Sequence, residues 1–291
     1  DTTLTGGDGA ADVIKIGTSG TAFAIAATDV WDGVTTVESI VAVANTVAVT
    51  VALDVTAYAA GIRTVDLSLA DSGTNGGNII NISEYVGTDA TTLTGTAGVD
   101  TITGGAGADT ITGGDGIDAL TGGAGADKFI FAATAAANDA DTISDFVAGA
   151  AGDVLNFNAF LAASASVANT LTSGVYVSPT VSALAVSGTS IAIGNKVLLV
   201  KETNLAYTAF DTAGEIVTLL ASGAWDAVDV AASTNAILIL QGTNSTTTQY
   251  VYMITNDGTT AVASGEIVLV GTMTTQANDI AAYTAANFEL V

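Results

Sequence analysis

The residues with the clearest capacity for chemistry are aspartates that recur every nine positions in a glycine-rich stretch. They are Asp100, Asp109, Asp118 and Asp127. A carboxylate is a hard anionic ligand, and calcium prefers six or more oxygens drawn from carboxylates and backbone carbonyls. The spacing therefore predicts a row of calcium sites, provided that the residues between the aspartates bring carboxylates and carbonyls together.

These residues do form a strict nine-residue repeat. Its units are GTAGVDTIT, GGAGADTIT, GGDGIDALT and GGAGADKFI, the first beginning at Gly95. Each has Gly at the fourth place, Asp at the sixth and an apolar residue at the eighth. We expect the early glycines to permit a sharp turn with positive φ that points its carbonyl oxygens inward. The last three residues should be extended, with the eighth side chain in the interior. The glycines assigned to the metal-binding turns are Gly95, Gly98, Gly104, Gly105, Gly107, Gly113, Gly114, Gly116, Gly122, Gly123 and Gly125.

Two units make one coil, so each turn should stack on the turn two units away. This geometry pairs the Asp100 turn with the Asp118 turn, and the Asp109 turn with the Asp127 turn. A cation between stacked turns would be held by carbonyls and carboxylates from both, which suits calcium better than magnesium with its tight octahedron. Without the ion these oxygens face one another unscreened, so folding and calcium binding should be coupled.

The units resemble the RTX (hemolysin-type) calcium-binding nonapeptide repeat, G-G-x-G-x-D-x-U-x. The resemblance implies an all-β fold, a right-handed parallel β-roll or β-solenoid with calcium in its turns. It also implies type I export of an unfolded chain that folds outside the cell. DTISDF and GDVLNF resemble the edge that closes the roll, which implies a further ion at Asp141, Asp145 and Asp153. One departure is Thr96, which stands where the first unit should have its second glycine.

Upstream of Leu93 the repeat is degenerate. The segment GGDGAADVI (Gly6–Ile14) is a looser copy with one extra residue before Asp12, which leaves a metal site at Asp12 and a plain turn equally open. Short β-like runs follow at Val37–Ile40, Val47–Leu53, Ile62–Leu69 and Ile79–Ile82. We interpret these runs as rungs of a less regular solenoid that leads into the repeats. The alternative is a small antiparallel sandwich.

Beyond Asn158 longer alternating runs favour a mostly β domain with one short helix. The expected strands are Lys196–Lys201, Ala236–Gln241, Gln249–Thr255 and Glu266–Thr272, with a turn at Asn256–Gly258 and a helix at Asp211–Ser222. The predicted domains are an irregular solenoid (1–92), the calcium-binding roll with its closing edge (93–157) and this C-terminal domain (158–291). The ending NFELV at Asn287–Val291 is compatible with a C-terminal export signal and equally with a final strand.

The charge balance is strongly acidic, with 29 acidic against 5 basic residues and a formal net charge of −24. Such a surface repels nucleic acid and anionic lipid, so neither is an expected partner. A halophilic or merely very soluble surface is the alternative explanation of the charge. The absence of His and Cys excludes the Ser-His-Asp triad, thiol catalysis and zinc sites of the usual kind, so we expect no enzyme activity. No apolar run is long enough for a membrane-spanning helix, and we expect no direct membrane insertion.

Three functional hypotheses remain. The first is a calcium-dependent, self-assembling extracellular surface protein, similar to the surface-layer (S-layer) proteins exported by type I systems. Its partners would be copies of itself in a lattice or filament, calcium and the type I export machinery. The second is a C-terminal export and folding module of a larger secreted enzyme or adhesin whose active domain lies upstream of Asp1. The third is an adhesin with a cell-surface glycan as its partner.

Overall fold

The chain is mostly β, with few and short helices. The computed structural model describes residues 12–16, 23–29, 31, 34–43, 48–70, 77–162, 175–178, 191–192, 197–201, 228–229, 235–241, 247–255, 264–275 and 282–289. Two compact units are distinguished: Asp1–Ile130 with Asp141–Ser144, and Phe131–Ala140 with Asp145–Val291. No helix among the described residues has the length and apolar character needed to cross a bilayer.

The first unit is a succession of short strands. They are β1 (Val13–Ile16), β2 (Phe23–Ile25), β3 (Ser39–Ala42), β4 (Val49–Ala52), β5 (Thr64–Asp66), β6 (Asn78–Asn81), β7 (Thr92–Thr94), β8 (Asp100–Thr103), β9 (Thr110–Thr112), β10 (Ala119–Thr121), β11 (Lys128–Ile130) and the first residues of β12 (Asp141–Phe146). One helix, α1 (Val55–Ala60), interrupts them. Threonine and β-branched apolar residues, which suit the pleated surface of a sheet, dominate the repeat strands.

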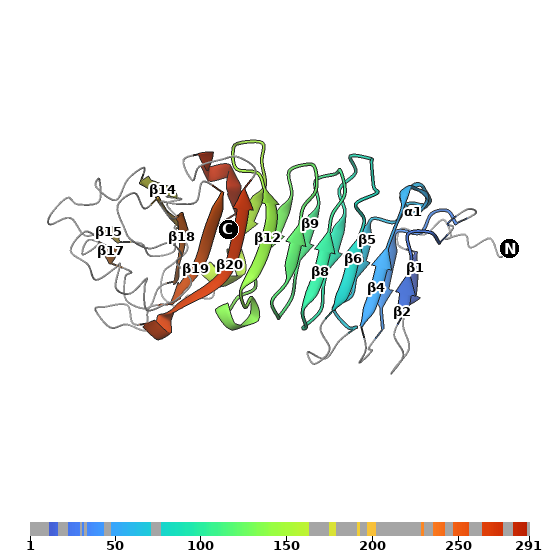
Figure 1. Ribbon diagram of the computed structural model, residues 1–291, viewed down its shortest axis with the longest axis horizontal. Helices are drawn as coiled ribbons and strands as arrows, with labels where there is room; N and C mark the ends of the chain where they lie inside the picture. Colours follow the sequence, from blue (N-terminus) through green and yellow to red (C-terminus); the bar gives the residue numbers. More distant parts are fainter. Residues whose placement is uncertain are drawn as a thin grey trace. The chain divides into compact units, whose positions relative to one another are not determined.

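Within this unit the chain alternates between two parallel sheets. The odd-numbered strands follow the order β1-β3-β5-β7-β9-β11, and the even-numbered strands follow β2-β4-β6-β8-β10-β12 (Figure 1). Each strand therefore pairs with the second strand before or after it in the chain, as in Leu120 opposite Ile102 and Phe129 opposite Ile111. This confirms the predicted stacking of every second repeat. The upstream pairs β1–β3 and β2–β4 are parallel as well, so the antiparallel sandwich considered for this region is wrong.

The eighth place of every repeat faces the interior, as predicted. Ile102 and Ile111 are fully buried, and Leu120 and Phe129 are at most 5% exposed. Each sheet continues its own buried column upstream, with Ile40, Val65 and Leu93 in one sheet and Val51 and Ile80 in the other. None of these five residues is more than 1% exposed. Burial of apolar side chains is the main stabilising contribution to such a fold. Two apolar columns, one in each sheet, therefore join the degenerate coils to the regular repeats.

Helix α1 was not anticipated from the sequence, although its two ends carry ordinary capping signals. The Asp54 carboxylate accepts hydrogen bonds from the amides of Thr56 (2.9 Å) and Ala57 (3.1 Å), which satisfies amides that the first turn leaves open. Gly61 ends the helix in the left-handed region, at φ 103°. Burial acts to raise the pKa of Asp54, but the hydrogen bonds from Thr56 and Ala57 outweigh it, and the pKa is lowered.

The second unit contains an antiparallel meander, β18 (Asn235–Gln241), β19 (Thr248–Thr255) and β20 (Ile267–Thr275), extended by the parallel strands β16 (Val197–Lys201) and β14 (Val175–Ser178). Four expected strands are thus confirmed, the last beginning one residue later than predicted because a 3-10 helix, η3, occupies Ser264–Glu266. The expected helix at 211–222 and turn at 256–258 lie outside the described residues. The unit also holds β13 (Val154–Asn156), β15 (Ile191–Ala192), β17 (Val228–Asp229), β21 (Phe288–Glu289), α2 (Asn158–Ala162), η1 (Ala135–Ala137) and η5 (Ala285–Asn287).

The last described residues form a strand rather than an isolated tail. Phe288 lies opposite Leu155 and Glu289 opposite Asn156 in the parallel pair β13–β21. The side chain of Asn287 is fully buried, and its Nδ2 donates to the carbonyls of Gly149 (2.9 Å) and Asp153 (2.7 Å). This agrees with the final-strand interpretation of the C-terminal sequence.

The buried columns should dominate the stability of the first unit. Replacing Ile102 by Ala removes buried methyl groups and leaves a cavity, and should lower the free energy of unfolding by about 2–5 kcal/mol. The matched control is Ile117→Ala in a repeat turn, where the side chain is 57% exposed and the change should stay within about 0.5 kcal/mol. Denaturant unfolding in calcium-containing buffer measures both, and equal losses would contradict the assignment of the core.

Candidate metal centre

The repeat carboxylates are buried rather than displayed on the surface. Asp100 is 2% exposed, and Asp109, Asp118 and Asp127 are each 1% exposed. Asp141, in the strand that follows the last repeat, is 5% exposed. An ionised carboxylate is costly to bury unless hydrogen bonds, counter-charges or a metal ion compensate for its lost hydration. The groups around these aspartates therefore decide what the turns can do.

In Asp118, Asp127 and Asp141 one carboxylate oxygen is bonded to a backbone amide of the stacked turn. The amide of Asp100 donates to Oδ1 of Asp118 (2.8 Å), and the amide of Asp118 donates to Oδ1 of Asp141 (2.9 Å). On the other side the amide of Asp109 donates to Oδ1 of Asp127 (2.8 Å), eighteen residues further along the chain. We call this arrangement the carboxylate ladder. It confirms the predicted pairing of the Asp100 and Asp118 turns and of the Asp109 and Asp127 turns.

In the first two units the second oxygen of the carboxylate is held within the aspartate's own turn. Oδ2 of Asp109 accepts a hydrogen bond from the amide of Gly105 (2.8 Å), and Oδ2 of Asp100 accepts one from the amide of Thr96 (2.5 Å). The Thr96 hydroxyl donates to the same oxygen (2.9 Å). Threonine at the second place of the first unit thus adds a donor that glycine would lack. These bonds orient the Asp100 and Asp109 carboxylates toward the start of their units.

In the first two units the first glycine leaves the space in which a carboxylate oxygen and a carbonyl oxygen converge. A Cβ on Gly95 would overlap both the carbonyl oxygen of Gly113 and Oδ2 of Asp100. In the next unit a Cβ on Gly104 would overlap the carbonyl oxygen of Gly122 and Oδ2 of Asp109. Carbonyl and carboxylate oxygens are the donors that calcium prefers. The chemistry of these cradles therefore fits calcium.

Backbone carbonyls have to contribute to any such site. In the part of the chain that the structure describes, no three His, Cys, Asp or Glu side chains gather in a group that could hold a metal ion. The repeat aspartates and the carbonyls of the stacked glycine turns are the residues that would hold calcium. Bound there, the ion would supply positive charge between oxygens that otherwise face one another.

Positive φ is more restricted than the sequence suggested. Within the four repeats it occurs at Gly114 (φ 117°), Gly116 (100°), Gly123 (101°) and Gly125 (132°), the second and fourth places of the last two units. The expectation of positive φ at the first-place glycines is wrong, because these residues are required for room. It is also wrong for Gly98, Gly105 and Gly107, which occupy second and fourth places in the first two units.

The remaining predicted ligands lie in varied surroundings. Asp145 is half-buried near the end of β12 and belongs to the second unit. Asp153 is 2% exposed, and its Oδ2 accepts a hydrogen bond from the amide of Val147 (2.7 Å) in the loop between β12 and β13. Asp12 is half-buried, and its amide donates to Oε2 of Glu38 (2.6 Å), the same kind of bond that builds the carboxylate ladder.

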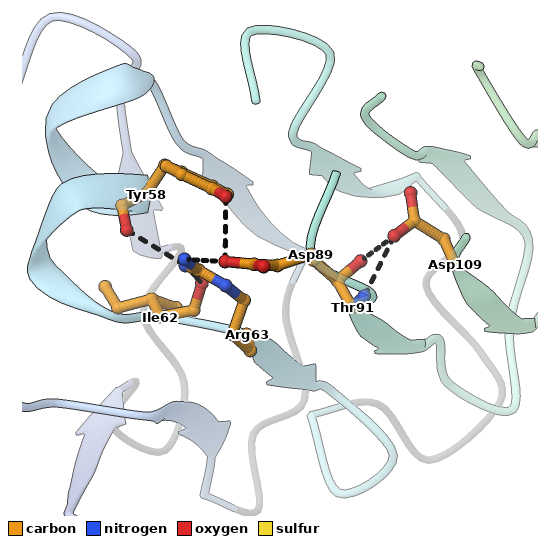
Figure 2. A network of polar contacts seen from close by, with 6 residues as sticks. All are labelled: Tyr58, Ile62, Arg63, Asp89, Thr91 and Asp109. Carbon is orange, nitrogen blue, oxygen red and sulfur yellow. Dashed lines mark hydrogen bonds and ion pairs between the residues drawn. The ribbon is translucent and has the colours of Figure 1, made fainter. Parts of the chain in front are cut away.

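Two ladder residues were missed because they are not acidic. Asn78 pairs in register with Asp100; its Nδ2 donates to Oδ1 of Asp100 (2.7 Å), and its Oδ1 accepts from the amide of Val49 (2.9 Å). Thr91 bonds Oδ1 of Asp109 through its amide (2.9 Å) and its hydroxyl (2.7 Å), as Figure 2 shows. Both stand at the sixth place of degenerate units, GTNGGNIIN (73–81) and VGTDATTLT (86–94), and a four-residue insertion between these units hides the period.

The close stacking of the turns should make Gly114 intolerant of any side chain. Gly114→Ala combines an unfavourable left-handed φ with a Cβ that would overlap the carbonyl oxygen of Thr96. Gly77→Ala is the matched control, since Gly77 has φ 103° and open space around its Cβ position. Both should lose about 1–2 kcal/mol of stability to strain. Only Gly114→Ala should also raise the calcium concentration needed for folding, and a similar rise in Gly77→Ala would contradict the stacked-turn geometry.

Comparison with known families agrees with this geometry. The RTX calcium-binding nonapeptide repeat (4 copies) matches residues 85–120 and, in a second placement, residues 94–129. The match begins upstream of Leu93 and so includes the degenerate unit that contains Thr91. Searches among curated proteins and among solved structures each found no match. Residues 85–129 are therefore RTX calcium-binding nonapeptide repeats, and calcium is the ion that such repeats bind.

Proposed function

We propose that the chain is a calcium-dependent structural protein of the cell surface, secreted unfolded and folded outside the cell by calcium. The observation that carries this proposal is the carboxylate ladder, in which aspartates of successive turns are buried one behind another. Proteins with RTX repeats are typically secreted by type I systems and extracellular, which supports the proposed location. We assign the chain no catalytic role.

The physical basis is the cost of burying like charges. Four repeat aspartates at 1–2% exposure belong to a chain whose formal net charge is −24, so repulsion opposes the compact state. Hydrogen bonds to backbone amides offset part of this cost, but a calcium ion between stacked turns offsets it directly. The two parallel sheets would then form the walls of a right-handed β-roll and the calcium-filled turns its edges. Where calcium is scarce the repeat turns from Gly95 onward should remain unfolded.

Removing the charge of one buried carboxylate tests whether that charge is needed for calcium-dependent folding. Asp118→Asn keeps an oxygen that can accept the hydrogen bond from Asp100 but loses the charge that calcium requires. In a calcium titration followed by circular dichroism, the β-sheet transition of the wild-type chain should lie at about 10⁻⁴–10⁻³ M. The Asp118→Asn midpoint should be higher by about tenfold, equivalent to about 1.4 kcal/mol.

The control lies in the same turn. Asp115 is exposed at the third place of the same unit, so Asp115→Asn removes an equal charge without touching the ladder. Its midpoint should stay close to that of the wild type. Equal shifts in the two variants would mean that calcium acts through general screening of the acidic surface and not through the buried carboxylates.

Self-assembly into a surface layer is the finer part of the proposal. Copies with 29 acidic and 5 basic residues repel one another, so a lattice of them needs cations at its contacts. Calcium would then act twice, inside each copy between turns and outside it between acidic faces. A β-rich second unit after the repeats is compatible with a subunit built for contacts rather than for catalysis.

A lattice of this kind should need calcium both to form and to remain intact. Electron microscopy of cell envelopes should show an ordered layer in millimolar calcium, and the layer should be shed into the medium when a chelator is added. Millimolar magnesium added after the chelator should not restore the layer, because the turns suit calcium better than magnesium. A layer that persists after calcium removal would contradict the proposed assembly.

One observation favours an alternative. The family match is confined to residues 85–129 and leaves most of the 291-residue chain outside it, as expected if the repeats are a folding and export module of a larger secreted enzyme or adhesin. A catalytic motif encoded upstream of Asp1 would favour that reading over the surface layer. Binding of the chain to a glycan array in calcium buffer would favour an adhesin.

A further inference from the structure

Arg63 occupies a position that corresponds to the aspartate at the sixth place of the repeat. Through the pairs β1–β3, β3–β5, β5–β7, β7–β9 and β9–β11, the residues immediately before the odd-numbered strands align in one column. From the N-terminal end this column reads Asp12, Glu38, Arg63, Thr91, Asp109 and Asp127. The backbone bonds agree, since the amide of Arg63 donates to the carbonyl of Glu38 and the amide of Thr92 donates to the carbonyl of Arg63. Arg63 is the only arginine in the sequence.

The guanidinium of Arg63 is surrounded by the same kinds of oxygen that calcium uses. Its two terminal nitrogens donate to Oδ2 of Asp89 (2.9 Å) and to the carbonyls of Tyr58 and Ile62 (2.9 Å each), as Figure 2 shows. The Tyr58 ring lies beneath it, 3.8 Å from the guanidinium carbon to the ring centroid. The Tyr58 hydroxyl also donates to Oδ2 of Asp89 (2.8 Å). The hydrogen bond from Tyr58, and then that from Arg63, hold the pKa of Asp89 below its usual range.

The cluster of Tyr58, Arg63 and Asp89 lies directly against the first calcium-binding turns. The carbonyl oxygen of Asp89 occupies the place that a Cβ on Gly107 would need, so its turn is in close contact with the second repeat. Two residues further on, Thr91 bonds the buried carboxylate of Asp109. The Tyr58 ring fills the space beside Gly87 and packs edge-on against Tyr85, with ring centroids 5.2 Å apart. The shape of residues 85–91 is therefore set by Tyr58 and Arg63 on one side and meets the repeats on the other.

We propose that the Arg63 guanidinium is a built-in cation that closes the N-terminal end of the calcium array and holds the Asp89 turn in the shape on which the first repeat turns stack. Arg63 is thus a positioning residue for calcium binding. Its fixed positive charge compensates the oxygens of this turn, as a metal ion does in the repeats downstream. This inference rests on the calcium-driven folding proposed above. It implies that the coils upstream of Gly95 are ordered before calcium arrives and provide the platform from which folding of the repeats proceeds.

An exposed ion pair alone would not suffice for this role. Asp89 has a side-chain exposure of 62%, and isolated pairs at such a surface contribute little. Arg63 is different because its side chain is only 26% exposed and its planar fork engages one carboxylate, two carbonyls and a ring together. Lysine could keep the charge but could not reach all of these partners with one point charge.

Hydrogen exchange read by mass spectrometry on the full chain tests the proposal in chelator and across a calcium titration. In chelator, the wild-type chain should protect residues 77–94 and leave residues 95–130 unprotected. Arg63→Gln should lose the protection of 77–94 and should raise the calcium midpoint of 95–130 by about three- to tenfold, because the stacking-competent turn becomes a minor population. Lys15→Gln removes an equal charge from an exposed position in β1 and should match the wild type.

Two further variants separate the role of the guanidinium from a general loss of folding. Asp89→Asn removes the carboxylate and leaves Arg63 in place, and should reproduce the Arg63→Gln midpoint; Arg63→Lys should recover part of the shift. If Arg63→Gln and Asp89→Asn both match Lys15→Gln, the proposal is overturned. Failure of the calcium proposal itself would give a different result. Hydrogen exchange in residues 95–130 would then be unchanged by calcium in every variant. The effect of Arg63→Gln on the protection of residues 77–94 in chelator could still be measured.

Discussion

The burial of carboxylates in stacked turns is the constraint on which the first unit depends. Asp100 and Asp118, and Asp109 and Asp127, follow one another at almost complete burial. Amides of their own turns orient Asp100 and Asp109, and amides of the neighbouring turns orient Asp109, Asp118 and Asp127. Amide hydrogen bonds fix the direction of a carboxylate but carry no net charge, so they cannot cancel the repulsion along the column. A divalent cation can do so. This is the physical basis of the calcium-dependent folding that we propose.

The rest of the architecture can be understood as the support for that column. Parallel pairing of every second strand brings equivalent turns into register, and the apolar columns at the eighth place maintain the register because a slip of one residue would expose them. Glycine at the first place leaves room for a carbonyl and a carboxylate oxygen in the same cradle. The N-terminal end of the array uses other chemistry: Asn78 and Thr91 are neutral hydrogen-bond partners, and Arg63 provides a permanent positive charge.

Some features escaped sequence reasoning for identifiable physical reasons. The residues Asp54 and Gly61 bracket α1 with ordinary cap chemistry, but the helix is too short to show an amphipathic period. Asn78 and Thr91 were not predicted because they are not acidic and because a four-residue insertion between their units breaks the nine-residue spacing. The first-place glycines were assigned positive φ, whereas the structure uses their lack of a Cβ. Local sequence does not distinguish these two uses of glycine, since the overlapping atom belongs to a turn eighteen residues away.

The sequence by itself determined the periodic part of the protein. The nine-residue spacing specifies which residue faces inward, which residue bears the charge and which turns stack, because a strand alternates its faces and two units complete one coil. Only the tertiary structure decided what closes the array and what surrounds it. The alignment of Arg63 with the repeat aspartates, and the contact of the Asp89 carbonyl with Gly107, arise from pairing between segments of irregular length. No period in the sequence encodes such pairing, because insertions between strands change the spacing while the sheet restores the register.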